Sequence, residues 1–325
     1  MSRRIERIWY DGAAVPVWLR GLVPVYKTLR ALYVVPYRCG WRKPERLPVP
    51  VIIVGNLTVG GSGKTPLVIA LVEALRVRGF RPGVVSRGYG GIQRKPLLLD
   101  DVPMPERVGD EPCLIRKRTG APVAVGRDRA RAAALLLERG VNVVIADDGL
   151  QNPSLARDME ICVIDGRRRF GNGRLLPAGP LRESLSRLDT IAFRVCNGGL
   201  VQADEIPMRL VGAMAVAVAG PAGARPLEAF AGQRVHGVAA IGNPERFFDS
   251  LRAHGIDVVP HAFADHRKFV PADLAFADDL PVLMTEKDAV KCTRFASASA
   301  NLWCVPVRAD LPDTFFDALA AGLRR

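Results

Sequence analysis

A glycine-rich turn between an apolar strand and an apolar helix is the part of this sequence best suited to chemistry. The run 50–54 is short, rich in β-branched residues and fully apolar, which is typical of a buried parallel strand. The turn over 55–65 reads GNLTVGGSGKT, and the residues at 66–76 predict an apolar helix that stops at Gly79. Backbone N–H groups in such a turn, together with the dipole of the helix N-terminus, can surround phosphate oxygens. This context predicts a nucleotide-binding P-loop.

Side chains within this turn have chemical uses of their own. Lys64 can reach the outer phosphates, and Thr65 offers a hydroxyl group to Mg²⁺. The strict P-loop pattern requires glycine at position 58, where this chain has threonine, although the later glycines can still form the turn. The residues predicted to bind the nucleotide are Thr58, Val59, Gly60, Gly61, Ser62, Gly63, Lys64 and Thr65.

Two adjacent carboxylates end a second apolar strand. The run 141–146 is followed directly by Asp147 and Asp148, as in a Walker B site, where one carboxylate lies near Mg²⁺ at the carboxyl edge of the sheet. Neighbouring residues on a strand point to opposite faces, so the two aspartates cannot serve identically. The sequence leaves open which of them faces the metal, and an ordinary acidic turn is the alternative interpretation.

Three further loops carry charged residues that suit a phosphate site. Arg87 follows a strand-like run, and its guanidinium group could bind a transferring phosphate. The turn 109–112 reads GDEP and could hold a base, and the loop 175–183 ends in Arg182 and Glu183. Taken alone, each of these segments could also be a solvated loop.

Strands that alternate with helices must position these groups. The pattern predicts an α/β protein built on a P-loop-type wound parallel sheet, with a second, smaller α/β unit and an N-terminal helical segment. In the second unit, we expect strands at 235–241, 257–259, 281–285 and 302–307 and a helix at 244–251. The predicted boundaries are 1–45, 46–225 and 226–325, with a hinge at 220–226.

The amino-acid composition limits the classes of binding partner that suit this chain. The chain has 325 residues and a formal net charge of +13, and ten Lys/Arg against three Asp/Glu fall within residues 1–50. Such a charge favours anionic partners, namely nucleic acid, phosphorylated ligands or an acidic membrane. Aromatic residues make up only 6% and do not alternate with basic ones, which disfavours a single-stranded nucleic-acid platform. The six cysteines lack C-x-x-C spacing, so we expect reduced thiols that mostly fill the core.

The N-terminal segment combines this basic charge with an apolar stripe. The stripe recurs at helical spacing and comprises Trp18, Leu22, Val25, Tyr26, Leu29, Leu32 and Tyr33. It could pack against the body of the protein, or it could lie in a membrane interface with its Arg and Lys residues on anionic lipid. The segment lacks the pattern of a signal peptide or a spanning helix. Pro24 is expected to divide it into two short helices.

In combination, these segments resemble one known family, the tetraacyldisaccharide 4′-kinases of lipid A synthesis. The matching stretches are VGNLTVGGSGKTP (54–66), SRGYG (86–90), GDEP (109–112), DDGLQ (147–151), LPAGPLRE (176–183), GNPERF (242–247), DH (265–266) with Phe269, and TEKDAVK (285–291). They follow one another in order along most of the chain, and Thr58 fits this family's variant of the turn. Leu150 and Asn152 stand where Phe and His are expected, which leaves the role of residue 152 open.

The resemblance implies an activity and a place in the cell. It implies an ATP- and Mg²⁺-dependent kinase whose acceptor is the 4′-hydroxyl group of the acylated disaccharide 1-phosphate. Such an enzyme works at the cytoplasmic face of the bacterial inner membrane, as a peripheral or monotopic protein. The basic segment then serves an anionic membrane surface, and no nucleic-acid partner is expected.

The resemblance also assigns roles to individual residues. Asp110 becomes the base that takes the acceptor proton, oriented by His266 from the second unit. The other three histidines lie in strand-like or loop contexts of the sequence, and we expect them to be structural or solvated. Catalytic roles extend to Lys64, Arg87 and Asp147. The Mg²⁺ ligands are Thr65 and Glu183 with one of the paired aspartates, for which Asp148 is taken. The acceptor-binding residues are Tyr89, Gln151 and Arg182.

Two alternative functions, and a closing motion between the two units, remain as hypotheses. A P-loop switch NTPase of the GTPase type is the first alternative, although TEKD at 285–288 matches the guanine-reading N-K-x-D pattern poorly. A nucleic-acid binder is the second, but it lacks a recognisable reading motif. If the chain is the kinase, closure of one unit onto the other is expected to bring His266 to Asp110 and to exclude water.

Overall fold

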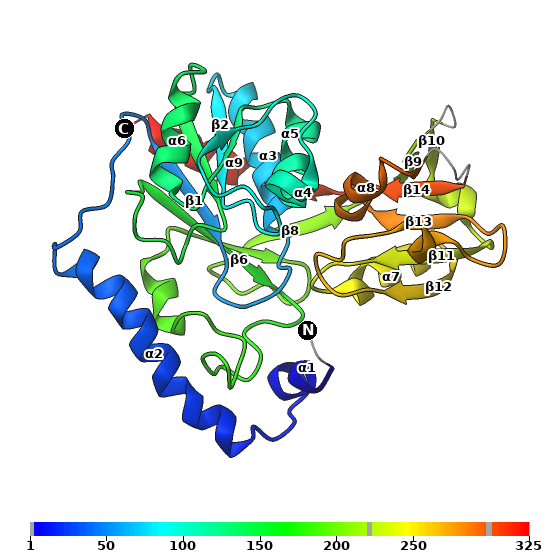
Figure 1. Cartoon of the computed structure of the whole chain (residues 1–325), viewed down its shortest axis with the longest axis horizontal. Helices are drawn as coiled ribbons and strands as arrows, with labels where there is room; N and C mark the ends of the chain where they lie inside the picture. Colours follow the sequence, from blue (N-terminus) through cyan, green and yellow to red (C-terminus); the bar gives the residue numbers. More distant parts are fainter. Residues whose placement is uncertain (1–2, 220–222, 297–300, 325) are drawn as a thin grey trace.

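The protein folds into two α/β units that lie side by side, each built on its own sheet (Figure 1). The computed structural model describes residues 3–219, 223–296 and 301–324. The larger unit contains a nine-stranded sheet and the smaller one a six-stranded sheet. The predicted fold class, wound and mostly parallel sheets in both halves, is confirmed.

The nine-stranded sheet has the order β15-β8-β7-β6-β1-β5-β2-β4-β3. Its strands are β1 Val51–Gly55, β2 Pro82–Ser86, β3 Leu97–Leu98, β4 Val123–Val125, β5 Val143–Asp147, β6 Met159–Asp165, β7 Phe193–Asn197, β8 Ile206–Val211 and β15 Arg308–Asp310. The associated helices are α3 Lys64–Val77, α4 Pro105–Val108, α5 Asp110–Thr119, α6 Arg129–Leu137, η1 Leu185–Thr190 and α9 Asp313–Leu323. The edge strands β3 and β15 are antiparallel to their neighbours, and the pairs between β8 and β4 are parallel.

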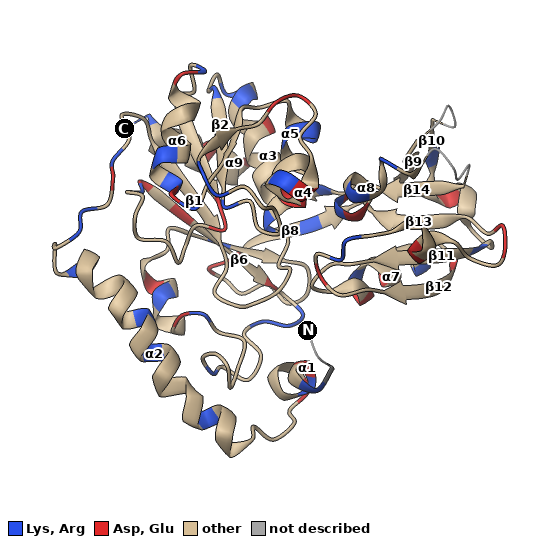
Figure 2. Ribbon diagram, viewed as in Figure 1, with Lys and Arg blue, Asp and Glu red and all other residues tan. Residues whose placement is uncertain are grey.

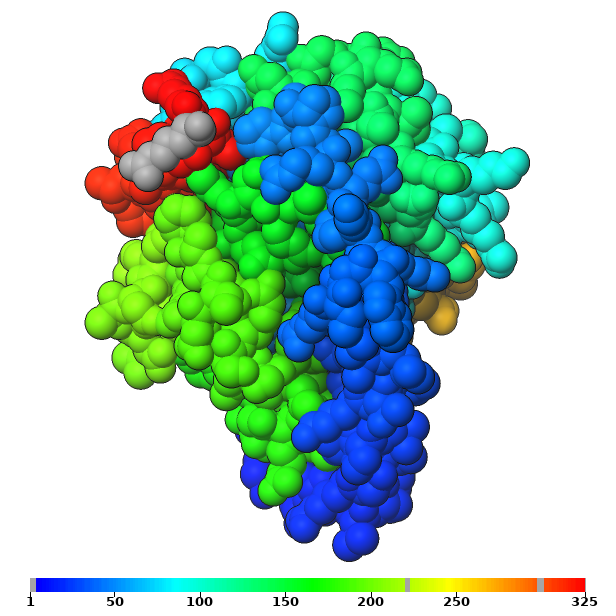
Figure 3. Space-filling model, turned by 90° about the vertical axis from the view of Figure 1, so that its left-hand side faces the viewer, coloured from blue at the N-terminus to red at the C-terminus, as the bar shows by residue number. Residues whose placement is uncertain are grey.

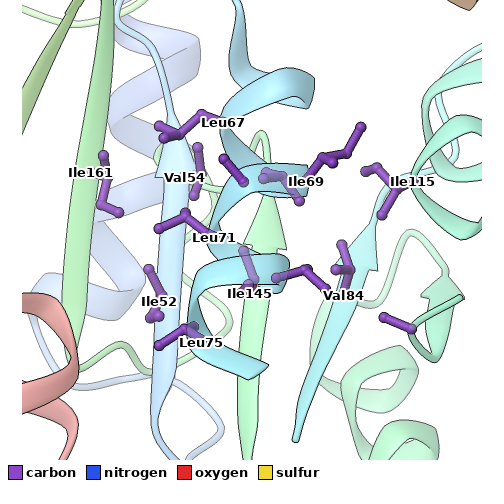
Figure 4. Close-up of a cluster of buried hydrophobic side chains, with 14 of the residues drawn as sticks. Ile52, Val54, Leu67, Ile69, Leu71, Leu75, Val84, Ile115, Ile145 and Ile161 are labelled. Atoms are coloured by element: carbon purple, nitrogen blue, oxygen red, sulfur yellow. The ribbon is translucent and has the colours of Figure 1, made fainter. Parts of the chain in front are cut away.

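Helix α3 is held against this sheet by apolar side chains at helical spacing (Figure 4). Leu67, Leu71 and Leu75 are at most 1% exposed and lie beside Val54 and Ile52 of β1. Each fully buried leucine contributes about 1.5–3 kcal/mol relative to an exposed one. Because β1 and α3 are both fixed in this core, the turn between them is rigidly placed. Five of the six cysteines are buried as well, and all are free thiols, as predicted.

The six-stranded sheet has the order β10-β9-β14-β13-β11-β12. Its strands are β9 Met214–Ala217, β10 Ala224–Pro226, β11 Arg234–Ala239, β12 Asp257–Ala262, β13 Val282–Thr285 and β14 Leu302–Val305. The associated helices are η2 Leu227–Phe230, α7 Pro244–Arg252, η3 Pro271–Leu274 and α8 Glu286–Cys292. The four strands and the helix predicted for this unit are all present.

The chain passes between the two units at different places from those predicted. Strand β9 already belongs to the six-stranded sheet, whereas β15 and α9 return to the larger unit, where Phe315 and Leu319 join its core. Of the predicted hinge, residues 220–222 lie outside the described residues and 224–226 form β10, which pairs with β9. Glycine and proline also suit a link between two antiparallel strands, and this ambiguity explains the misplaced boundary.

The N-terminal segment forms two helices, α1 Arg3–Tyr10 and α2 Val17–Arg38. The predicted break of the second helix at Pro24 is wrong, because α2 runs through both Pro24 and Pro36. Pro24 removes the N–H that would bond to the carbonyl of Arg20, but that residue is exposed, so water can take its place. Among the described helices, none combines the length and the apolar character needed to cross a bilayer. Figure 3 shows this segment, in blue, projecting beyond the body of the molecule.

Candidate active site

The glycine-rich turn leaves the buried strand β1 and leads into α3, as the sequence predicts. Gly60 and Gly63 adopt φ values of +116° and +95°, which L-residues rarely tolerate. A Cβ atom at Gly63 would also overlap the side-chain amide of Asn197 on β7. A Cβ atom at Gly242, just before α7, would overlap the backbone nitrogen of Gly61, so the smaller unit also approaches the turn closely.

Hydrogen bonds tie the same turn to the loop that ends in Arg182 and Glu183. The Val59 N–H donates to the Pro180 carbonyl at 2.9 Å, and the Arg182 N–H donates to the Leu57 carbonyl at 2.7 Å. On the other side, the amide of Asn197 donates to the Ser62 carbonyl at 2.9 Å. These bonds fix the curvature of the turn from both flanks, which preorganises it for an anion.

Lys64 is held between an amide and a carboxylate at the start of α3. Its Nζ donates to Oδ1 of Asn56 at 3.0 Å and lies 3.4 Å from Oδ1 of Asp148. Arg182 contacts the same carboxylate, with Nη1 3.1 Å from Oδ1. Asp148 also has a φ of +50°, the left-handed region that non-glycine residues seldom enter. Its side chain is therefore committed to the two cations.

The two adjacent aspartates have opposite electrostatic environments. Asp147 is 1% exposed, and neither of its carboxylate oxygens has a hydrogen-bond partner among the described residues. Burial, with Glu111 and Asp148 nearby, raises the pKa of Asp147 to about 7. Burial would also raise the pKa of Asp148, but Lys64 and then Arg182 outweigh it and lower that pKa. The structure thus separates two residues that the sequence could not distinguish.

A chain of polar contacts continues from Arg182 to the N-terminal helix. Nη1 of Arg182 donates to Oε1 of Gln151 at 3.2 Å, and Nε2 of Gln151 donates to Oε1 of Glu183 at 3.0 Å. The other carboxylate oxygen of Glu183 lies 2.7 Å from Nη2 of Arg30 on α2. Tyr26 of α2 also donates its hydroxyl to the Arg182 carbonyl at 2.8 Å. The predicted residues Gln151, Arg182 and Glu183 therefore form one connected group.

Asp110 and His266 are in contact, although they come from different units. Nδ1 of His266 lies 3.2 Å from each carboxylate oxygen of Asp110, the first residue of α5. Burial would raise the pKa of Asp110, but the His266 hydrogen bond and the Lys287 cation lower it to about 2. Burial would lower the pKa of His266, and the bond to Asp110 raises it. Since the contact is already made, the structure has the arrangement that the closure hypothesis expects.

Most of the predicted residues border one cleft of about 2080 Å³, which is lined from both units. Among the lining residues are Lys64, Thr65, Arg87, Tyr89, Asp148, Gln151, Arg182 and His266. The ring of Tyr89 packs edge-on against His266, with centroids 4.8 Å apart. Asp110, Asp147 and Glu183 are at most 8% exposed and lie behind this lining. Within the described chain, Arg87 has neither an ion pair nor a side-chain hydrogen bond.

Several residues that complete the site were not singled out from the sequence. Asn56 accepts the hydrogen bond from Lys64, and Arg129 donates to the Asp147 carbonyl at 2.9 Å. Lys287 lies 3.8 Å from Oδ2 of Asp110. The TEKD stretch that contains Lys287 counted toward the family resemblance and as a weak guanine-reading motif, but Lys287 itself was given no role; its charge was the signal that could have found it.

The residues present suit a magnesium ion bound together with phosphate oxygens. No cluster of three or more His, Cys, Asp or Glu residues that could hold a metal occurs in the part of the chain that the structure describes. Mg²⁺ commonly takes one or two carboxylates, with water and substrate phosphates completing its shell. Asp147 offers two buried oxygens that have no hydrogen-bond partner among the described residues, and Thr65 lines the cleft. Asp148 and Glu183, the other expected ligands, are engaged by cations in this structure.

Comparison with known proteins gives a consistent result over the whole chain. The family model described as tetraacyldisaccharide-1-P 4′-kinase matches residues 15–324. A tetraacyldisaccharide 4′-kinase of Stenotrophomonas maltophilia is 54% identical, with 97% of this chain and 95% of the relative covered. One from Xanthomonas axonopodis pv. citri is 50% identical, with 100% and 98% covered. The crystal structure of LpxK from Aquifex aeolicus in complex with ATP is 27% identical, with a TM-score of 0.74 and 94% and 98% covered.

Proposed function

The chain belongs to the tetraacyldisaccharide-1-phosphate 4′-kinase family, and on this premise we propose how its residues divide the work of phosphoryl transfer. It is an ATP-dependent kinase that phosphorylates the 4′-hydroxyl group of the lipid A precursor, which gives lipid IVA. The observation that carries the residue assignment is that Lys64 and His266 line the same cleft from different units. A phosphate donor and a proton acceptor can therefore meet there.

The triphosphate of ATP binds in the turn 58–65. Residues 59–65, which include the first residues of α3, line the cleft. Backbone N–H groups there and the N-terminus of α3 can bind phosphate oxygens, and Lys64 supplies the cation for the outer phosphates. Lys64 is paired with Asp148 in the structure, and an arriving phosphate competes for it. Arg87 lines the cleft without an ion pair in the described chain, so its charge is available to the transferring group.

The acceptor hydroxyl gives its proton to Asp110 as the phosphoryl group arrives. The low pKa of Asp110, about 2, keeps the carboxylate ionised at neutral pH. His266 orients this carboxylate and presents the pair to the cleft. Phosphoryl transfer depends chiefly on positioning and charge stabilisation, and an aspartate that accepts the hydroxyl proton suits that chemistry. Tyr89, Gln151 and Arg182 border the space left for the sugar.

Thr65 and the carboxylate of Asp147 would hold Mg²⁺ on the phosphate side of the cleft. Its chemistry would be neutralisation of the charge on the β- and γ-phosphates. Asp148 instead positions Lys64 and Arg182, and Glu183 positions Arg30. Calorimetric titration of ATP binding against Mg²⁺ tests this division. Asp147→Asn should reduce the effect of Mg²⁺ on the affinity for ATP at least tenfold. Asp148→Asn should chiefly lower the affinity for ATP itself.

Helix α2 carries the enzyme to its acylated acceptor at the membrane. Its outward face presents Trp18, Leu29 and Leu32, which are 65%, 63% and 68% exposed. Arg20 and Lys27 are exposed as well, but at 100° per residue they lie on the opposite side of the helix, and Figure 2 shows the charges of α2 spaced widely along the helix. An exposed apolar face on a helix that also carries basic residues is typical of a helix that lies in an anionic interface. We place the enzyme peripherally at the cytoplasmic face of the bacterial inner membrane.

Transfer of labelled γ-phosphate from ATP to the disaccharide 1-phosphate in mixed micelles tests the catalytic assignment. Asp110→Asn should lower turnover by about 10²–10⁴-fold, the usual contribution of a positioned base, while ATP affinity is kept. Lys64→Ala should lower both turnover and ATP affinity. The matched control Asp317→Asn alters an exposed carboxylate on α9 that pairs with Arg78. If Asp110→Asn behaves like this control, the assignment of the base is wrong.

Flotation with vesicles tests the membrane assignment. Leu29→Ser combined with Leu32→Ser should abolish binding to vesicles that contain anionic lipid, because most of the exposed apolar face is lost. The control Leu200→Ser changes an equally exposed leucine, at 77%, on a loop of the larger unit. Equal loss of binding in both variants, or none in either, would contradict a role for α2.

A further inference from the structure

We propose that Lys287 is a positioning residue for the reaction, which holds the carboxylates around the Asp110–His266 pair in place from the second unit. The proposal rests on the proposed role of Asp110 as the base. It assigns a function to the TEKD stretch at 285–288, which otherwise has none in the site.

Lys287 stands at the meeting point of three carboxylates. Its Nζ atom lies 3.0 Å from Oε1 of Glu111, 3.6 Å from Oδ1 of Asp265 and 3.8 Å from Oδ2 of Asp110. Glu111 and Asp110 begin α5 in the larger unit, whereas Asp265 precedes His266 in the smaller one. One ammonium group therefore contacts Asp110 across the boundary between the units and Asp265 within its own unit, and Oδ1 of Asp265 lies 3.7 Å from Nε2 of His266. Figure 2 shows the charged residues of α4, α5 and α8 gathered there.

Burial makes these contacts electrostatically strong. The Lys287 side chain is 16% exposed and that of Asp110 is 4% exposed. Burial would lower the pKa of Lys287, but Glu111 and then Asp110 raise it above its ordinary value. The ammonium group is thus charged whenever the enzyme works. Without it, three carboxylates would face one another with little solvent between them.

The neighbouring Lys291 does not hold the carboxylates around the Asp110–His266 pair in the same way. Its Nζ is also 3.8 Å from Oδ2 of Asp110, but it lies 2.6 Å from Oδ1 of Asp288. Asp288 is fully buried and accepts hydrogen bonds from Thr285 and from the Ala240 backbone N–H. Lys291 therefore mainly balances a structural carboxylate, whereas Lys287 faces only carboxylates at the catalytic pair.

Removal of the Lys287 charge should move the titration of the catalytic pair. The groups that face it are Lys287, Lys291, Glu111, Asp265, the thiol of Cys113 and the ring of Tyr89. Lys287 lowers the pKa of Asp110 and also that of His266, so its loss raises both. Since activity requires ionised Asp110, the acidic limb of the pH profile must move to higher pH.

The test measures kcat and KM against pH for Lys287→Met, with Arg118→Gln as the matched control. Arg118 pairs with Glu286 at 2.8 Å, so the control also breaks an ion pair between α5 and α8, but away from Asp110. Lys287→Met should lower kcat at pH 7 at least tenfold, leave KM for ATP within about twofold, and shift the acidic limb upward by about 1–3 pH units. Lys287→Arg should return the acidic limb of the pH profile to its wild-type position, because it restores the positive charge.

Two results would overturn the proposal. One is an acidic limb that stays in place in Lys287→Met, and the other is an equal shift in Arg118→Gln, since either would reduce Lys287 to a structural contact. If Lys287→Met does not fold, the double variant Lys287→Met/Glu111→Gln can replace it, because it removes one charge of each sign. The acidic limb of its pH profile must then lie at higher pH than that of the single variant Glu111→Gln. Failure of the base assignment is recognised separately, because Asp110→Asn would then retain turnover whatever Lys287 does.

Discussion

Replacement of Gly109 by alanine probes how closely Asp110, the proposed catalytic base, is positioned. Gly109 immediately precedes Asp110 and has a φ of +94°. A Cβ atom there would lie 2.5 Å from the Tyr89 carbonyl oxygen, a backbone atom that cannot swing away as a side chain would. Ordinary contact begins at 3.4 Å, so the start of α5 and the loop that carries Tyr89 must separate by about 0.9 Å.

A displacement of this size is large on the scale of the site. The hydrogen bonds between Asp110 and His266 measure 3.2 Å, and a further 0.9 Å would take them beyond hydrogen-bonding range. Misplacement of a reacting group by about 1 Å can cost about 10²-fold in rate, or about 2.7 kcal/mol. We expect Gly109→Ala to lower kcat by this amount. KM for ATP should change little, because the turn 58–65 lies on another loop.

Gly120→Ala is the matched control for the effect of the backbone. Gly120 ends the same helix α5 with a φ of +60°, but no atom lies within 4 Å of the position that a Cβ atom would take there. Gly120 is left-handed, with a ψ of 6°, and Gly109 has a ψ of 155°, a backbone region essentially restricted to glycine. Both variants therefore carry backbone strain of about 1–3 kcal/mol, and only Gly109→Ala also carries the clash. Steady-state kinetics and thermal melting of both variants separate the two effects. Equal kcat values in the two variants would refute the reasoning.

Three other substitutions give separate outcomes. Asn56→Ala removes the acceptor 3.0 Å from Nζ of Lys64, and it should raise KM for ATP about tenfold in the transfer assay, a loss of about 1.4 kcal/mol. Phe248→Ala empties a fully buried position in the smaller unit and should lower the free energy of unfolding by about 3–5 kcal/mol in urea titrations. Burial and the neighbouring His236 lower the pKa of His261 below 6.5, so the folded state binds this proton less readily than the unfolded state. Its contribution to stability is therefore complete above pH 6.5 and is lost as the pH falls below it, and His261→Phe should flatten that part of a plot of melting temperature against pH.

The elements that hold the phosphate turn were predictable from local patterns. The apolar run before Gly55 and the apolar spacing after Lys64 each have one stable solution, a buried strand and a helix packed on it. The carboxyl ends of β1 and β5 meet at one edge because the strands pair in parallel, with Val54 beside Asp147. A sequence pattern therefore places the turn and the aspartates together.

Other features depend on contacts that no local pattern encodes. The opposite environments of Asp147 and Asp148 follow from Lys64 and Arg182, which reach only one of them. The passage of Pro24 through α2 depends on an exposed helix face where water can replace a lost bond. The return of α9 to the larger unit is set by its apolar face on α3. Each outcome rests on tertiary neighbours, and these are absent from a pattern of residue types.

The contacts of Arg30 connect α2, the helix proposed to face lipid, to the turn 58–65 that we propose binds phosphate. Arg30 on α2 is bound to Glu183, which through Gln151 and Arg182 reaches the Asp148 carboxylate beside Lys64. Bonds of 2.7–3.2 Å link each member to the next. If α2 lies in the membrane interface as proposed, its depth there fixes the height of the phosphate turn above the lipid. The hydroxyl group of a sugar at the level of the lipid headgroups is then already aligned with the γ-phosphate. Part of the free energy of membrane binding by α2 is thereby used to orient the reacting atoms.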